Sequence, residues 1–156
     1  MSYFKVNFDE AMFDDTNEAR IRVVIWNSPG EVMASLFKKI LKPSSMTALE
    51  LLAARLAVLF AWEIDLHQIV LEGDLEFVIS SLKSGTNLGS MYGPVIRDVL
   101  SFVNSFQSVS FSHSYRQGNV VADALIKRAR LSFQLLVWMK SVPSNVVHFV
   151  LADFPA

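Results

Sequence analysis

The stretch TALELLAARLAVLFAW, from Thr47 to Trp62, decides the fold, because it is a long apolar run with only two charges, Glu50 and Arg55. As a helix it places Glu50 on one stripe with the alanines at positions 53, 54, 57 and 61. Small side chains let a helix lie close to a sheet, so we expect Glu50 to point into the protein. A buried carboxylate needs a hydrogen bond, an ion pair or a metal ion.

Length and composition limit the class of protein. The chain has 156 residues and no cysteine, which predicts one domain without disulfides or thiolate metal sites. The two charges in its longest apolar run argue against a membrane span. Because the N-terminal segment is acidic and lacks an apolar signal core, we expect an intracellular protein, in the nucleus or the cytoplasm. The net charge of −1 provides no global basic field for nucleic acid.

The order of apolar patterns predicts an α/β fold. Three strands joined by turns form an antiparallel meander, and Pro29-Gly30 supplies the second turn. After the long helix, which Ser45 or Thr47 could cap, two more strands alternate with helices and would pair in parallel. We therefore predict a five-stranded mixed sheet flanked by helices. The expected strands are Tyr3–Phe8, Ile21–Trp26, Val32–Phe37, Gln68–Leu71 and Val109–His113, and the later helices are Leu75–Leu82, Val95–Phe106 and Val120 to about Leu136.

Four acidic residues recur where strands end or helices begin. Asp9 follows the first strand, Glu50 lies early in the long helix, Asp74 follows the fourth strand, and Asp123 lies early in the helix after the fifth. Ligand sites in open α/β sheets gather at such positions, and convergent carboxylates bind hard cations such as Mg²⁺.

Each of these residues also has a simpler interpretation. Asp9 could lie in a solvated turn, Asp74 could cap a helix, and Asp123 could serve only the helix dipole. His113 lies on the same strand face as two apolar residues and could be a histidine at the edge of the core. Glu50 is harder to explain in this way, because a charge on an alanine stripe needs a partner.

Five segments of this chain resemble, in order, the type 1 ribonuclease H domain. The resemblance is closest to plant domains related to non-LTR retrotransposon reverse transcriptases, and it covers roughly residues 3–129. The last segment carries the most specific spacing of histidine, arginine, asparagine and Ala-Asp. The segments are VNFD, SPGEV, ALELLAARLA, VLEGD and SHSYRQGNVVADAL. We expect residues 1–130 to form this domain and residues 131–156 to form a helical extension packed on it.

The resemblance implies an endonuclease that cuts the RNA strand of an RNA–DNA hybrid with Mg²⁺, or Mn²⁺ as a substitute. By position, Asp9, Glu50, Asp74 and Asp123 match the four metal-binding carboxylates of the family. His113 matches a histidine that assists proton transfer or product release. Asn119 and Arg116 would contact the substrate, although Arg116 could instead only brace its loop.

Two departures from the family pattern leave a second hypothesis open. The glycine that normally follows the first aspartate is Glu10 here, and two small residues of the next strand are Arg20 and Arg22. The region between the middle helices also lacks the basic protrusion of many active enzymes, so phosphate contacts would be few. The domain could therefore be domesticated, without catalysis, and bind a nucleic acid or a protein. Without a metal ion, Glu50 should have a raised pKa or pair with Arg20 or Arg22.

Overall fold

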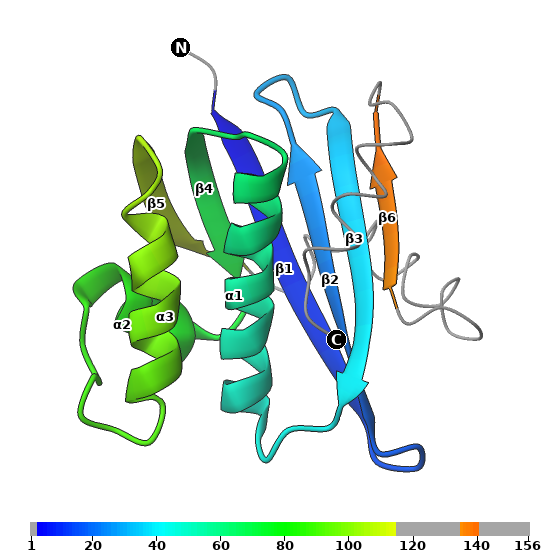
Figure 1. The fold of residues 1–156 in the computed structure, drawn as a ribbon, viewed down its shortest axis with the longest axis vertical. Helices are drawn as coiled ribbons and strands as arrows, with labels where there is room; N and C mark the ends of the chain where they lie inside the picture. The colour runs from blue at the N-terminus through cyan, green and yellow to red at the C-terminus, as the bar shows by residue number, and fades with distance from the viewer. Residues whose placement is uncertain (1–2, 115–134, 141–156) are drawn as a thin grey trace.

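A computed structural model describes residues 3–114 and 135–140 of the chain. Within them, a mixed sheet is covered on one face by three helices (Figure 1). The strands are β1 (Phe4–Phe13), β2 (Glu18–Trp26), β3 (Val32–Leu41), β4 (Gln68–Gly73), β5 (Ser108–His113) and β6 (Leu135–Met139), and the helices are α1 (Met46–Glu63), α2 (Glu76–Ser84) and α3 (Gly93–Val103).

The predicted sheet is present. Its order is β5-β4-β1-β2-β3-β6, with β1, β2 and β3 antiparallel and with β4 and β5 parallel to β1. Gly30 adopts a φ of 95° in the turn between β2 and β3, a conformation that glycine reaches without steric cost. The ribonuclease H-like architecture expected from the sequence is confirmed, with one strand more than predicted.

The sixth strand corrects the expectation of a helix reaching Leu136 and of a fully helical C-terminal extension. Residues 135–139 pair antiparallel with β3 between Lys38 and Ala34. The sequence LLVWM is rich in residues that favour strands, and pairing satisfies backbone groups along the β3 edge. The rest of the predicted extension and the boundary at residue 130 lie outside the described residues.

β1 is longer than predicted, which changes the place of Asp9. Pairing with β2 continues through Phe13, opposite Glu18, whereas pairing with β4 stops at Asn7, opposite Glu72. Asp9 and Glu10 therefore lie within a strand, just beyond the end of its parallel neighbour. The expected turn after Asp9 occurs later, at residues 14–17.

Helix α1 lies against the sheet as the alanine stripe predicted. All four alanines of the stripe, and Glu50 itself, are fully buried. The hydroxyl of Ser45 caps the helix by accepting a hydrogen bond from the Ala48 N–H at 3.1 Å, so Ser45 rather than Thr47 is the N-cap. None of the helices in the described ranges is long and apolar enough to cross a membrane.

The two faces of the central strands differ in chemistry. On the α1 face, β1 contributes Val6 and Phe8 to the main hydrophobic core. Because side chains alternate along a strand, Asn7 and Asp9 point to the opposite face. Cross-strand pairing places Arg22 beside Asp9 and Arg20 beside Ala11, so that this second face carries buried charges.

Candidate metal centre

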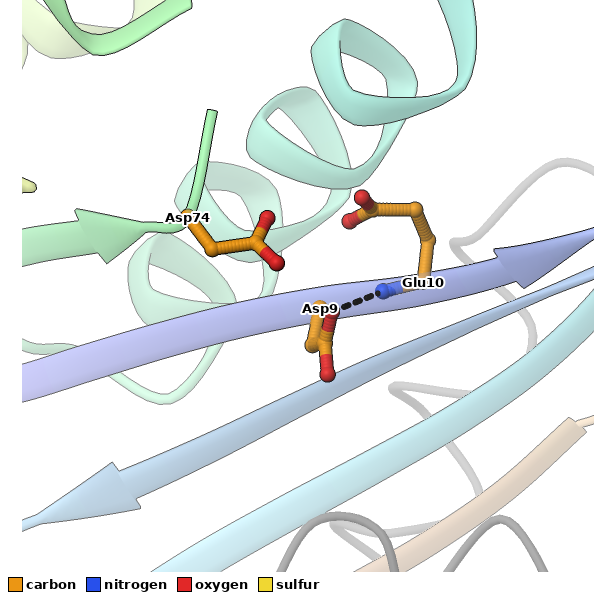
Figure 2. A group of neighbouring side chains, drawn as sticks. All are labelled: Asp9, Glu10 and Asp74. Atoms are coloured by element: carbon orange, nitrogen blue, oxygen red, sulfur yellow. Dashed lines mark hydrogen bonds between the residues drawn. The ribbon is translucent and has the colours of Figure 1, made fainter. Parts of the chain in front are cut away.

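Carboxyl groups from different parts of the chain meet beside the middle of β1. Asp9, Glu10 and Asp74 each offer an oxygen within 4.8 Å of the others. Asp9 and Glu10 come from β1, whereas Asp74 follows the last residue of β4. Figure 2 shows the carboxyl groups of Glu10 and Asp74 turned toward the same space under α1, while that of Asp9 points to the other side of the strand. Alternation along β1 explains this division.

Glu50 joins this group from α1. Its Oε2 accepts a hydrogen bond from the Leu75 N–H at 3.1 Å, at the start of α2. Leu75, not Asp74, is the N-cap of that helix, so the interpretation of Asp74 as a cap is wrong. Gly73 leaves room for the carboxylate, because a Cβ there would lie 2.9 Å from Glu50 Oε2 and 2.5 Å from Phe8 Cζ.

Asp9 is held by donors of the protein itself. The Glu10 N–H donates to Asp9 Oδ1 at 2.8 Å, and Arg22 Nη2 donates to Asp9 Oδ2 in an ion pair. The Arg22 side chain is fully buried, which strengthens this attraction. Of the two alternatives expected for Glu50, these contacts do not show the pairing with Arg20 or Arg22, because Arg22 pairs with Asp9. Arg20 instead places its Nη2 3.7 Å from Glu18 Oε1, and its Cζ lies 4.0 Å from the centre of the Phe13 ring.

Burial and repulsion disturb the titration of the acidic group. Burial, a hydrogen bond with Glu50 and the neighbouring negative charges raise the pKa of Glu10 far above its ordinary value. Burial is also the largest cause that raises the pKa of Glu50, to about 7, while hydrogen bonds with Glu10 and Leu75 act against it. At neutral pH, Glu10 therefore keeps its proton and shares it with Glu50. The expectation of a raised pKa for Glu50 is confirmed.

The oxygen atoms available as ligands in this acidic group fit a hard divalent cation. Glu10 Oε2, Glu50 Oε1 and Asp74 Oδ1 are buried, and among the described residues no N–H group donates a hydrogen bond to them. Carboxylate oxygens are the ligands that Mg²⁺ and Mn²⁺ prefer. Metal binding would supply the positive charge that these oxygens lack.

Of the other predicted site residues, one is described by the structure and three are not. His113, at the end of β5, donates from Nε2 to the backbone carbonyl of Asp74 at 2.9 Å, so it lies beside the acidic group. Asp123, Asn119 and Arg116 fall outside the described residues, and their roles stay predictions.

In the sequence, Glu10 and Arg22 stood out as departures from a motif, and Arg22 also as a possible partner of Glu50, but neither was predicted as a ligand or as the partner of Asp9. Their strand positions contained a usable signal. Because side chains alternate along a strand, residue 10 lies on the same face as Phe8. An apolar residue such as Phe8 indicates the face that packs against the core, which is the α1 side. The partner of Arg22 depends on the register between β1 and β2, which turn length alone did not reveal.

Comparisons with known proteins agree with the fold. A family model described as Reverse transcriptase-like matches residues 7–129. The comparison with curated proteins found no match. The RNase H1 of the archaeon Halobacterium salinarum superposes with a TM-score of 0.67 and 23% identity, covering 79% of this chain and 93% of that one.

Two further structures share the fold at lower identity. The N-terminal RNase H domain of a Mycobacterium tuberculosis protein has a TM-score of 0.71 at 14% identity, covering 83% of this chain and 94% of that one. LC11-RNase H1, solved in complex with an RNA/DNA hybrid, has a TM-score of 0.62 at 15% identity. The match covers 81% of this chain and 99% of that one.

Proposed function

The chain belongs to the reverse transcriptase-like family, and on that premise we propose that it is a metal-dependent endonuclease of the ribonuclease H type. Its substrate would be the RNA strand of an RNA–DNA hybrid. The observation that carries this proposal is the cluster of Asp9, Glu10 and Asp74, from β1 and the end of β4, which Glu50 joins from α1.

The proposed roles follow from the positions of these residues. In the pattern that the family resemblance implies, Asp9, Glu50 and Asp74 would hold Mg²⁺ or Mn²⁺, together with Asp123. When bound, such ions activate a water molecule and stabilise charge on the reacting phosphodiester, in a two-metal arrangement. His113 is fixed by Asp74 at the rim of the group and would exchange protons with the substrate or product. Asn119 and Arg116 would contact the nucleic acid.

The choice of substrate has indirect support. The LC11-RNase H1 structure holds an RNA/DNA hybrid, and a foamy-virus protease-reverse transcriptase, 20% of whose chain matches this fold, was also solved with one. A hybrid is recognised largely by shape, phosphates and 2′-hydroxyl groups, so little sequence preference is expected.

A second candidate function is binding without cleavage, in a domesticated domain of retrotransposon origin. The ion pair between Arg22 and Asp9 favours it, because a fixed positive charge already lies where the resemblance expects a metal ion. Glu10 adds bulk and an acidic group to the same site. The partner would be a nucleic acid or another protein.

A cleavage assay with a labelled RNA–DNA hybrid tests the first function against the second. The proposal expects RNA cleavage with Mg²⁺ or Mn²⁺, and loss of cleavage in Asp74→Asn and in Glu50→Gln. Cleavage that persists in both variants would identify a contaminating nuclease. The exposed Glu76→Gln variant, which keeps the same helix, is the matched control.

The same assay locates a defect if the parent protein is inactive. Cleavage restored by Glu10→Gly would place the defect at residue 10. Hybrid binding without cleavage, in the parent and in Glu10→Gly, would establish the second function. Absence of both cleavage and hybrid binding would leave a protein as the partner.

A further inference from the structure

The carboxyl groups of the site differ in what already satisfies them. Both oxygens of Asp9 accept hydrogen bonds from the protein, one from the Glu10 N–H and one from Arg22. Glu10 Oε2, Glu50 Oε1 and Asp74 Oδ1 are buried and have no N–H donor among the residues that the structure describes. Glu10 is 4% exposed and Glu50 is 0% exposed, so water does not solvate them freely. The unmet demand for positive charge therefore lies on the α1 side of the strand.

We propose that the cation site of this chain is built on Glu10, Glu50 and Asp74, and that Arg22 takes the place of a metal ion at Asp9. Glu10 is then a metal ligand instead of an obstruction. This ligand set replaces the one that the proposed function takes from the family resemblance, in which Asp9 binds metal and residue 10 is glycine.

The directions of the side chains support this set. Glu10 and Asp74 turn their carboxyl groups toward each other beneath α1 (Figure 2). Glu50 reaches the same space from α1, since a hydrogen bond links it to Glu10. Gly73 keeps that space open, because any side chain there would meet Glu50 Oε2.

Electrostatics favours one cation over two. A bound ion would displace the proton that Glu10 holds, and the three carboxylates then outweigh the charge of one divalent ion and can hold it. On the other side of β1, the guanidinium of Arg22 already contacts Asp9, and its positive charge would repel a second cation. We therefore expect one divalent ion per chain among the described ligands.

Calorimetric titration with Mn²⁺, without nucleic acid, tests the inference directly. The parent should bind Mn²⁺, and Glu10→Gln should weaken the Kd by at least about tenfold, because it removes a charged ligand and keeps its shape. Asp9→Asn should change the Kd by less than about threefold, because Asp9 is not a ligand in the proposed site. Glu76→Gln, an exposed acid outside the group, is the control and should bind like the parent.

Several results would overturn the inference. They are no Mn²⁺ binding by the parent, unchanged or tighter binding by Glu10→Gln, and a tenfold loss in Asp9→Asn. If Asp9→Asn does not fold, the double variant Asp9→Asn with Arg22→Met removes the whole ion pair and should keep parental affinity. Circular dichroism checks that each variant is folded.

The inference rests on the proposed function for the kind of ligand, and the titration separates the two. Binding that depends on Glu10 in a protein that does not cleave hybrid would refute the nuclease and keep the ligand set. Cleavage with binding that depends on Asp9 and not on Glu10 would refute the ligand set and keep the nuclease.

Discussion

At the scale of single residues, Glu10 and Arg22 determine the electrostatics of the site. They flank Asp9, one as its neighbour in β1 and the other across the β1–β2 ladder. Arg22 neutralises Asp9, whereas Glu10 adds an acid to the group that Glu50 and Asp74 form. The site thus contains both a resident positive charge and an excess of carboxyl groups.

The ion pair should be needed for stability. Arg22→Met removes the buried positive charge that pairs with the Asp9 carboxylate, which costs about 3–5 kcal/mol of unfolding free energy. Adding Asp9→Asn removes the charge and should restore most of that loss. Urea denaturation measures both. The exposed Arg97→Met should change the unfolding free energy by less than about 0.5 kcal/mol. A single Arg22 variant as stable as this control would contradict the prediction.

The metal-free protein should lose stability as the pH rises. The pKa of Glu50 is raised from 4.5 to about 7, and that of Glu10 is raised further. The folded chain therefore holds protons that the unfolded chain releases above about pH 4.5, and this stabilisation disappears as the pH passes the raised values. We expect a lower Tm at pH 8 than at pH 5, and a smaller difference in Glu10→Gln. Thermal melts in chelator, at constant ionic strength, measure it.

At the scale of elements, the ends and lengths of the strands place the acidic group. β4 ends at Gly73 while β1 continues past it, so Asp74 turns toward the middle of β1 rather than toward its end. α1 then crosses this point, with Glu50 hydrogen-bonded to the start of α2. The site depends on close contact among three elements, and Gly73 lies where they meet.

A side chain at residue 73 should disturb this contact. The Cβ of Gly73→Ala would lie 2.5 Å from Phe8 Cζ and 2.9 Å from Glu50 Oε2. Relief of that overlap should cost about 1–3 kcal/mol of unfolding free energy, as overpacked cores usually do. Gly89→Ala is the control, because a Cβ there meets nothing within 4 Å. Equal stability of the two variants in chemical denaturation would show that the contact is not tight.

At the scale of the whole molecule, the fold collects negative charge at one place although the chain has a net charge of −1. Helices α1, α2 and α3 cover one face of the sheet (Figure 1). By strand alternation and register, the opposite face of β1 and β2 carries the buried Asp9 and Arg22. Folding therefore costs energy at the acidic group, and a ligand that binds there should stabilise the entire domain.

Divalent cations should raise the Tm of the protein. At a concentration of 100 times the Kd, binding to the folded state alone adds about 2.7 kcal/mol to the unfolding free energy. Mg²⁺ or Mn²⁺ should produce this rise in the parent and in Glu76→Gln, and Asp74→Asn should abolish it. Differential scanning calorimetry at several concentrations measures the effect. A parent Tm that is independent of both metals would remove the metal site.

Local patterns in the sequence predicted much of the fold because they depend on nearby residues. The alanine stripe identified α1 and the burial of Glu50, and the turn at Gly30 identified the β2–β3 hairpin. The end of β1 and the strand β6 were mispredicted, because a strand continues where a partner pairs with it. A pairing strand that is distant in sequence leaves no mark in the residues near the end of the strand it pairs with.

The sequence by itself determined that Glu50 is buried and that Asp74 follows a strand, since helical periodicity and strand ends are local properties. Only the tertiary structure decided which charges meet. Strand register set Arg22 beside Asp9, and alternation along a longer β1 sent Glu10 to the α1 side. A carboxylate buried by one element takes its partners from others, so the chemistry of this site depends on how the elements pack.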